Sequence, residues 1–197
     1  MSESEIVTTL RGIVAVFDEL GIAYQIGGSV ASSAYGKARS TMDVDLVASV
    51  SAQHVGPLVS MLEKEYYISE PAIRDAIARR TSFNAVHLET MLKVDVFILK
   101  ARPYDRQALG RRHPDALDPE NPSTQFYLCS PEDIILNKLE WYRLGGEQSE
   151  RQWNDVIGVL KIQWPSLDTV YCRKWAQELR IVDLLEKAFL EADILKS

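Results

Sequence analysis

Residues 27–47 read GGSVASSAYGKARSTMDVDLV, and their pattern of small, apolar and acidic residues is the strongest local signal for the fold. The run 23–26 before it reads as a short strand that enters a Gly27-Gly28-Ser29 turn. Small residues up to Tyr35 then favour a closely packed helix. Asp43-Val44-Asp45 opens a second strand by its alternation of acidic and apolar residues. The predicted order is therefore strand, glycine turn, helix, strand.

The two aspartates of the second strand are the first candidates for chemistry. Positions i and i+2 point to the same side of a strand, about 6.6 Å apart, so Asp43 and Asp45 share one face. One or two hard cations can bridge carboxylates at that separation. Asp95 is isolated in another apolar strand, predicted over 92–99, and all three carboxylates converge if the two strands are neighbours. Three aspartates around Mg²⁺ are typical of in-line attack on a phosphate.

The glycine turn suits the phosphates of a nucleotide. Gly27 and Gly28 carry no side chain, so backbone N–H groups there can approach a triphosphate closely. The Ser29 hydroxyl and the N-terminus of the following helix add further donors. The turn is therefore a predicted phosphate-binding element.

A lysine in the C-terminal part offers a second phosphate contact. Ser130 and Pro131 predict the start of a helix, and Lys138 falls in its apolar stripe with Ile135 and Leu139. A lysine that faces inward needs an anion. That anion is either a bound phosphate or a neighbouring carboxylate, Glu132 or Asp155.

These motifs resemble the signature of the nucleotidyltransferase superfamily, in which a glycine turn precedes an acidic pair and a third acid lies on a later strand. The residues that match are Gly28, Ser29, Asp43, Asp45 and Asp95. The sequence motif that contains Tyr35-Gly36, Arg39 and Thr41 is similar to that of the AbiEii/AbiGii-like nucleotidyltransferases, which include toxins of toxin–antitoxin and phage-defence systems.

The resemblance implies an α+β fold, with a mixed sheet flanked by helices over 1–128 and a small helical region over 129–197 that packs on it. It implies an enzyme of the EC 2.7.7 type that moves an NMP group from an NTP to an acceptor hydroxyl with Mg²⁺ or Mn²⁺. Asp43 and Asp45 would bind both ions, while Asp95 would complete one ion site and help deprotonate the acceptor. The nucleotide-binding residues would be Gly27, Gly28, Ser29, Arg39 and Lys138. Arg39 would either bind phosphate or brace the carboxylates.

The acceptor is less well defined than the reaction. The resemblance implies the 3′ end of tRNA or another RNA, and a cognate antitoxin as partner. The arginines of the segment 102–121 agree with this, whereas a net charge of −6 argues against bulk coating of nucleic acid. Two alternatives stay open: transfer to a small hydroxylated compound, as in antibiotic nucleotidyltransferases, and a non-catalytic nucleotide-binding module.

Composition sets the remaining limits. The 197 residues are 46% hydrophobic and 25% charged, which is typical of a folded domain that needs neither disulfides nor a structural metal. Cys129 and Cys172 stand alone, which excludes a thiolate zinc site. Neither a signal peptide nor a membrane span is visible, so a cytoplasmic location is predicted. Residues 102–121, rich in Pro, Asp and Arg, are predicted to form a long, poorly ordered loop.

Overall fold

The computed structural model describes residues 4–37, 43–118 and 122–192. It divides into two compact units. The first contains Met1–Gly27 and Thr41–Leu128, and the second contains Gly28–Ser40 and Cys129–Ser197. Residues 28–40 therefore group with the C-terminal helices.

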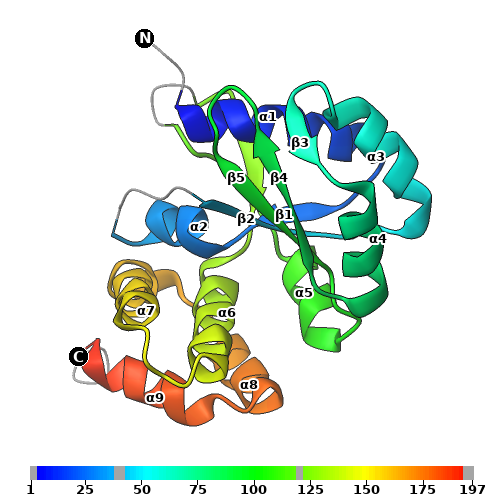
Figure 1. The fold of residues 1–197 in the computed structure, drawn as a ribbon. Helices are drawn as coiled ribbons and strands as arrows, with labels where there is room; N and C mark the ends of the chain where they lie inside the picture. Colours follow the sequence, from blue (N-terminus) through cyan, green and yellow to red (C-terminus); the bar gives the residue numbers. More distant parts are fainter. Residues whose placement is uncertain (1–3, 38–42, 119–121, 193–197) are drawn as a thin grey trace. The chain divides into compact units, whose positions relative to one another are not determined.

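The first unit is built on a mixed sheet of seven strands in its described part, which confirms the predicted α+β class (Figure 1). The strand order is β3-β4-β5-β2-β1-β7-β6. The strands are β1 (Tyr24–Ile26), β2 (Asp43–Ala48), β3 (Tyr66–Ile68), β4 (Ser82–His87), β5 (Lys93–Ile98), β6 (His113–Ala116) and β7 (Gln125–Leu128). β2 runs parallel to β5, and β1 runs parallel to β7; the other neighbours are antiparallel.

One face of this sheet is the core of the unit, because apolar residues alternate with polar ones along the strands. Val44, Leu46 and Val96 are completely buried. The helices of the unit are α1 (Glu5–Glu19), η1 (Ala52–His54), α3 (Val55–Leu62), α4 (Glu70–Arg79) and α5 (Pro103–Gly110). α4 packs against β4 and β5, and α3 packs against α1, α4 and β3. The acidic residues of β2 and β5 are left on the opposite face.

The prediction of a long loop over 102–121 is wrong for its described part, because α5 and β6 lie within it. Pro103 begins the helix, and the Arg102 guanidinium donates two hydrogen bonds to the Asp105 carboxylate at 2.6 and 3.0 Å. Tyr104 is buried. β6 then pairs with β7, a strand that the sequence analysis did not predict. The segment lacks a repeating apolar pattern, and its helix and strand are stabilised by tertiary packing instead.

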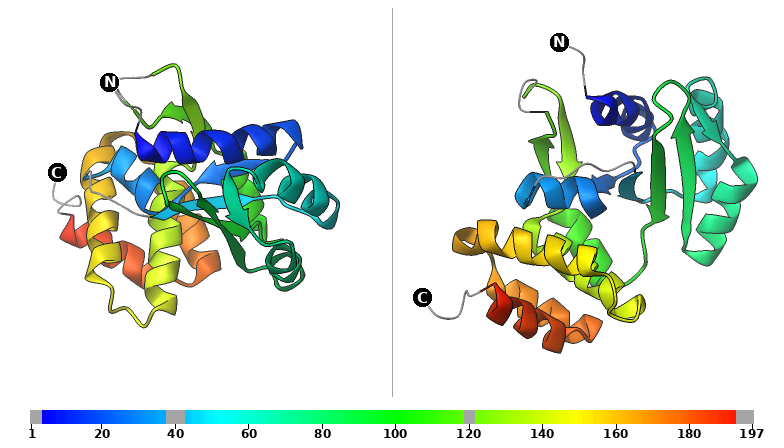
Figure 2. Two further views of the ribbon diagram at one scale, coloured as in Figure 1. Left: turned by 45° about the horizontal axis from the view of Figure 1, so that its top comes forward. Right: turned by 60° about the vertical axis from the view of Figure 1, so that its left-hand side comes forward.

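The second unit is helical. Its elements are α2 (Gly28–Tyr35), α6 (Pro131–Leu144), α7 (Glu150–Gln163), η2 (Trp164–Ser166), α8 (Thr169–Leu179) and α9 (Val182–Glu191). α6 packs on α2, α7, α8 and α9, and α7 packs on α2 (Figure 2). Ser130 caps α6 as predicted, since its hydroxyl accepts a hydrogen bond from the Asp133 N–H. In the part of the chain that the structure describes, no helix is long and apolar enough to cross a membrane.

A buried tyrosine joins α1 to β3 in the first unit. The Tyr66 hydroxyl donates to the Thr9 carbonyl at 2.5 Å and accepts from the Ile13 N–H at 3.2 Å. A Cβ at position 12 would lie 2.6 Å from this hydroxyl, which explains the glycine there in spite of its cost inside a helix. Burial raises the pKa of Tyr66 to about 12.

We expect this tyrosine to make the protein sensitive to alkali. Below pH 10 the phenol is protonated in both folded and unfolded chains; above pH 10 the unfolded chain ionises first, so stability is lost as the pH rises toward 12. In Tyr66→Phe the fall in unfolding free energy between pH 10 and pH 12 is smaller, measured by urea titration. Part of the fall remains, because burial also raises the pKa of Tyr24 to about 12. A curve identical to that of the wild type contradicts the assignment.

Candidate active site

The three predicted carboxylates lie on one face of two adjacent strands in the first unit. In the parallel pair of β2 and β5, the Cα of Asp45 is opposite that of Asp95, and Asp43 is opposite Lys93. Val44 and Val94 point to the buried face, so their neighbours Asp43, Asp45 and Asp95 point to the other one. Asp43 is exposed, whereas Asp45 and Asp95 are partly exposed. The sequence analysis assumed that the two strands are neighbours, and the sheet order shows that they are.

The first glycine of the turn is fixed beside the same strand. The Gly27 N–H donates a hydrogen bond to the Asp45 carbonyl at 2.9 Å, directly after the antiparallel pairing of Ile26 with Leu46. Gly28 follows with φ +54°, a left-handed conformation that glycine adopts without strain. The chain thus leaves β1 next to Asp45 and begins α2 at Gly28.

A lysine lies among the carboxylates. The Lys93 ammonium is 2.7 Å from Asp95 Oδ2 and 3.6 Å from Asp43 Oδ1. The hydrogen bond to Asp95 is the main reason that the pKa of Lys93 is raised, and the charge of Asp43 adds to it. Lys93 and Asp95 stand at i and i+2 in β5, so the sequence already places them on one face; their pairing was nevertheless not predicted.

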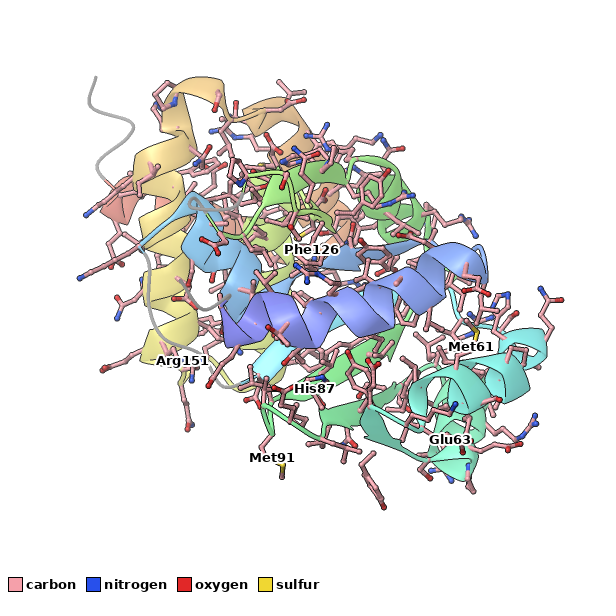
Figure 3. All side chains as sticks on the ribbon, turned by 90° about the horizontal axis from the view of Figure 1, so that it is seen from above. Met61, Glu63, His87, Met91, Phe126 and Arg151 are labelled. Carbon is pink, nitrogen blue, oxygen red and sulfur yellow. The ribbon has the colours of Figure 1, made fainter. Side chains whose placement is uncertain are left out.

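The second unit holds the other predicted phosphate-binding residues that are described. Ser29 is in the first turn of α2, where free N–H groups and the helix dipole favour an anion. Figure 3 labels Arg151, at the start of α7. Its guanidinium donates a hydrogen bond to Ser29 Oγ at 3.3 Å. Arg39 lies outside the described residues.

Lys138 is buried, as its place in the apolar stripe predicts, and its ammonium donates to Asp155 Oδ2 at 2.8 Å. Each of the two side chains is only 10% exposed. Of the two carboxylates considered from the sequence, Asp155 is thus the partner. The pair lies between α6 and α7, the helices that support α2 within this unit.

Comparisons with known proteins agree on the fold. No protein-family model and no curated protein matches the chain. A solved structure of an antigenic nucleotidyltransferase-like protein from Paracoccidioides brasiliensis is similar with a TM-score of 0.62 and 17% identity, over 98% of this chain and 91% of that one. The crystal structure of ANT(2″)-Ia in complex with adenylyl-2″-tobramycin has a TM-score of 0.59 and 17% identity, over 90% and 98%.

The chain has a nucleotidyltransferase fold. The narrower likeness to the AbiEii/AbiGii-like group stays a prediction from the sequence. Both solved structures are matched over almost their whole length, so the likeness includes the helical second unit as well as the sheet.

The donor chemistry of this nucleotidyltransferase fold suits a hard divalent cation. Three carboxylates on one face offer the oxygen ligands that Mg²⁺ and Mn²⁺ prefer. Within the described residues, no three acidic, histidine or cysteine side chains are gathered closely enough to hold a metal ion. Instead, the Lys93 ammonium lies between Asp43 and Asp95. In this structure the positive charge beside Asp43 and Asp95 is therefore that of Lys93.

Arg151 matches a position of the resembled AbiEii/AbiGii-like enzymes but has no role assigned from the sequence, and its contact with Ser29 makes it a candidate phosphate ligand. Arginine binds phosphate oxygens through charge-assisted hydrogen bonds. We expect Arg151→Met to raise the KM for NTP about tenfold, with a smaller change in kcat, in steady-state assays. The matched control is Arg173→Met in α8, whose guanidinium binds Glu186 at 2.8 Å instead. Equal KM values in the two variants refute the role.

Proposed function

We propose that this protein is a nucleotidyltransferase that moves an NMP group from an NTP to an acceptor hydroxyl and releases pyrophosphate. The observation that carries the proposal is the register of β2 and β5, which sets Asp45 opposite Asp95 with Asp43 on the same face. The fold agrees with it. Mg²⁺, or Mn²⁺ in its place, is the proposed cofactor, with Asp43, Asp45 and Asp95 as ligands.

Each group has a defined task in this proposal. Ser29, the N-terminus of α2 and Arg151 bind the β- and γ-phosphates, with Gly27 and Gly28 giving the backbone room to approach. Arg39 and Lys138 are proposed as further phosphate contacts. For Lys138 this requires its ammonium to act while paired with Asp155. That the glycine turn and the carboxylates serve one nucleotide is part of the proposal and rests on the resemblance of residues 27–47.

The reaction is a substitution at the α-phosphorus. The acceptor oxygen forms the new P–O bond, the bond to the bridging oxygen of pyrophosphate breaks, and pyrophosphate leaves with the bonding electrons. Asp95 receives or relays the proton of the acceptor hydroxyl. The divalent ions, when bound, would activate the attacking oxygen and offset charge on the leaving group. The protein otherwise contributes positioning and charge neutralisation.

For the acceptor we propose the 3′ end of an RNA, in an enzyme of the toxin or phage-defence type with an antitoxin as partner. This rests on the resemblance of residues 27–47. The arginines of 102–112 support it less than the sequence suggested, because Arg102, Arg111 and Arg112 already have partners. Arg102 binds Asp105, and Arg112 donates to the Leu109 carbonyl and lies 4.9 Å from the Tyr127 ring.

The alternative acceptor is a small hydroxylated compound. The experiment is incubation with each α-labelled NTP, Mg²⁺ or Mn²⁺, and either total RNA or a panel of hydroxylated small molecules that includes aminoglycosides. Label in RNA, with an affinity that falls as salt rises, supports the RNA assignment; label in a small compound replaces it with the alternative. NTP binding without pyrophosphate release under any condition overturns the enzyme and leaves a nucleotide-binding module.

A further inference from the structure

The position of Lys93 has a consequence for metal binding. Its ammonium meets carboxylates from two neighbouring strands, Asp95 on its own strand and Asp43 across the strand pair. Asp45 is on the same face, opposite Asp95. Like charges on one face of two neighbouring strands repel one another in a metal-free protein. One positive charge among them offsets part of that repulsion.

The lysine is held by charge rather than by packing. Its side chain is 40% exposed, and its partners Asp43 and Asp95 are 57% and 22% exposed. A lysine ammonium ends a flexible four-carbon stem with several accessible rotamers. It can therefore leave the carboxylates at small cost, because ion pairs at this exposure are weak.

We infer that Lys93 is a displaceable internal cation: it keeps Asp43 and Asp95 together in the metal-free protein and gives up both carboxylates to an entering divalent cation. The inference rests on the proposed function for the location of the metal. Its own basis is the position of the Lys93 ammonium, which contacts one carboxylate on each of the two neighbouring strands. Lys93 is thus a positioning residue that sets metal affinity by competition.

Removal of the ammonium should then change metal binding and metal-free stability in opposite directions. In Lys93→Met an entering cation has no ion pair to break and no neighbouring positive charge to oppose it. We expect Mn²⁺ to bind about five- to tenfold more tightly, measured by the loss of the free Mn²⁺ EPR signal in the absence of nucleotide. The metal-free variant should melt at a lower temperature than the wild type at low ionic strength, and saturating Mn²⁺ should close the gap.

Two further variants serve as controls for the charge and position of Lys93. Lys100→Met removes the same charge from an exposed position just after β5, and its Mn²⁺ affinity should stay within about twofold of the wild type. Lys93→Arg keeps a cation beside the carboxylates, so the metal-free form of this variant should melt near the wild-type temperature, unlike Lys93→Met.

Failure of this inference differs from failure of the proposed function. The first case requires that Asp45→Asn weakens Mn²⁺ binding, which shows that the carboxylates hold the ion. Mn²⁺ binding that is then unchanged or weaker in Lys93→Met, in a variant with the circular dichroism spectrum of the wild type, overturns the role of Lys93. Full Mn²⁺ affinity in Asp45→Asn shows instead that these carboxylates do not hold the ion, and both proposals then fall. Tighter binding in Lys93→Met together with weaker binding in Asp45→Asn supports both.

Discussion

Asp45→Asn should abolish NMP transfer, with a loss in kcat of at least about a thousandfold, while the protein stays folded. Asp45 is the central carboxylate, beside Asp43 on β2 and opposite Asp95 on β5. Asparagine keeps the shape but removes the charge that would hold a divalent ion, and catalysis of phosphate transfer depends mainly on such charges. The side chain is only partly buried, so the neutral amide should not disturb the sheet. The measurement is the rate of pyrophosphate release.

The matched control for this variant is Asp75→Asn in α4. Asp75 is an exposed aspartate of the same unit and pairs with Arg79 one helical turn away, at 2.8 Å. Its replacement changes the net charge equally and should leave the rate unaltered. If Asp45→Asn retains more than a tenth of wild-type activity, Asp45 is not a catalytic ligand.

The second large effect should be on stability. Asp155→Ala leaves the Lys138 ammonium buried without its partner, and breaking a buried ion pair in this way costs about 3 kcal/mol. Urea unfolding at neutral pH measures the loss. The double replacement Lys138→Met with Asp155→Leu removes both charges and should recover most of the stability, because an apolar pair of similar volume packs in the same place.

An exposed ion pair of the same length gives the comparison. Arg173 and Glu186 also meet at 2.8 Å, but their side chains are 46% and 38% exposed. Glu186→Ala should cost less than about 1 kcal/mol, because water screens the pair. The same double replacement at 138 and 155 also tests the proposed phosphate contact. Lys138 has no part in nucleotide binding if the double variant keeps the wild-type KM for NTP.

Local signals in the sequence predicted much of the fold. The alternation of polar and apolar residues along 43–48 predicted which face of β2 is buried, and Ser130 with Pro131 predicted where α6 begins. The structure confirms both predictions. The buried position of Lys138 was predicted from its place in an apolar stripe. Each of these depends on residues within one or two turns, or on one face of a single strand.

Contacts between distant segments were harder to predict. The alternation along a strand fixes which face a residue occupies but not which strand lies beside it, so the pairing of Asp45 with Asp95 was an assumption. β7 has few residues, and its place depends on Ile26 of β1 and on the strand β6 that pairs with it. The choice of Asp155 over Glu132 as partner of Lys138 depends on how α7 packs against α6.

Two residues joined the candidate site only once the structure was known. One of them has a local signal in the sequence, and the other depends on a contact between distant segments. Lys93 could have been found from the sequence, since it stands at i and Asp95 at i+2 along one strand, which puts both on the same face. The contact of Arg151 with Ser29 could not have been found, because it joins the first turns of two helices that are far apart in the chain.

The most direct test of NMP transfer compares NTP labelled in the α-phosphate with the same NTP labelled in the γ-phosphate, under conditions where NTP is consumed in the presence of the acceptor. We expect the α label to become covalently bound to the acceptor and the γ label to appear only in pyrophosphate. In Asp45→Asn neither the labelled acceptor nor labelled pyrophosphate should form. Transfer of the γ label to the acceptor, or its release as inorganic phosphate, would contradict the account, because the bond broken would then lie between the β- and γ-phosphates.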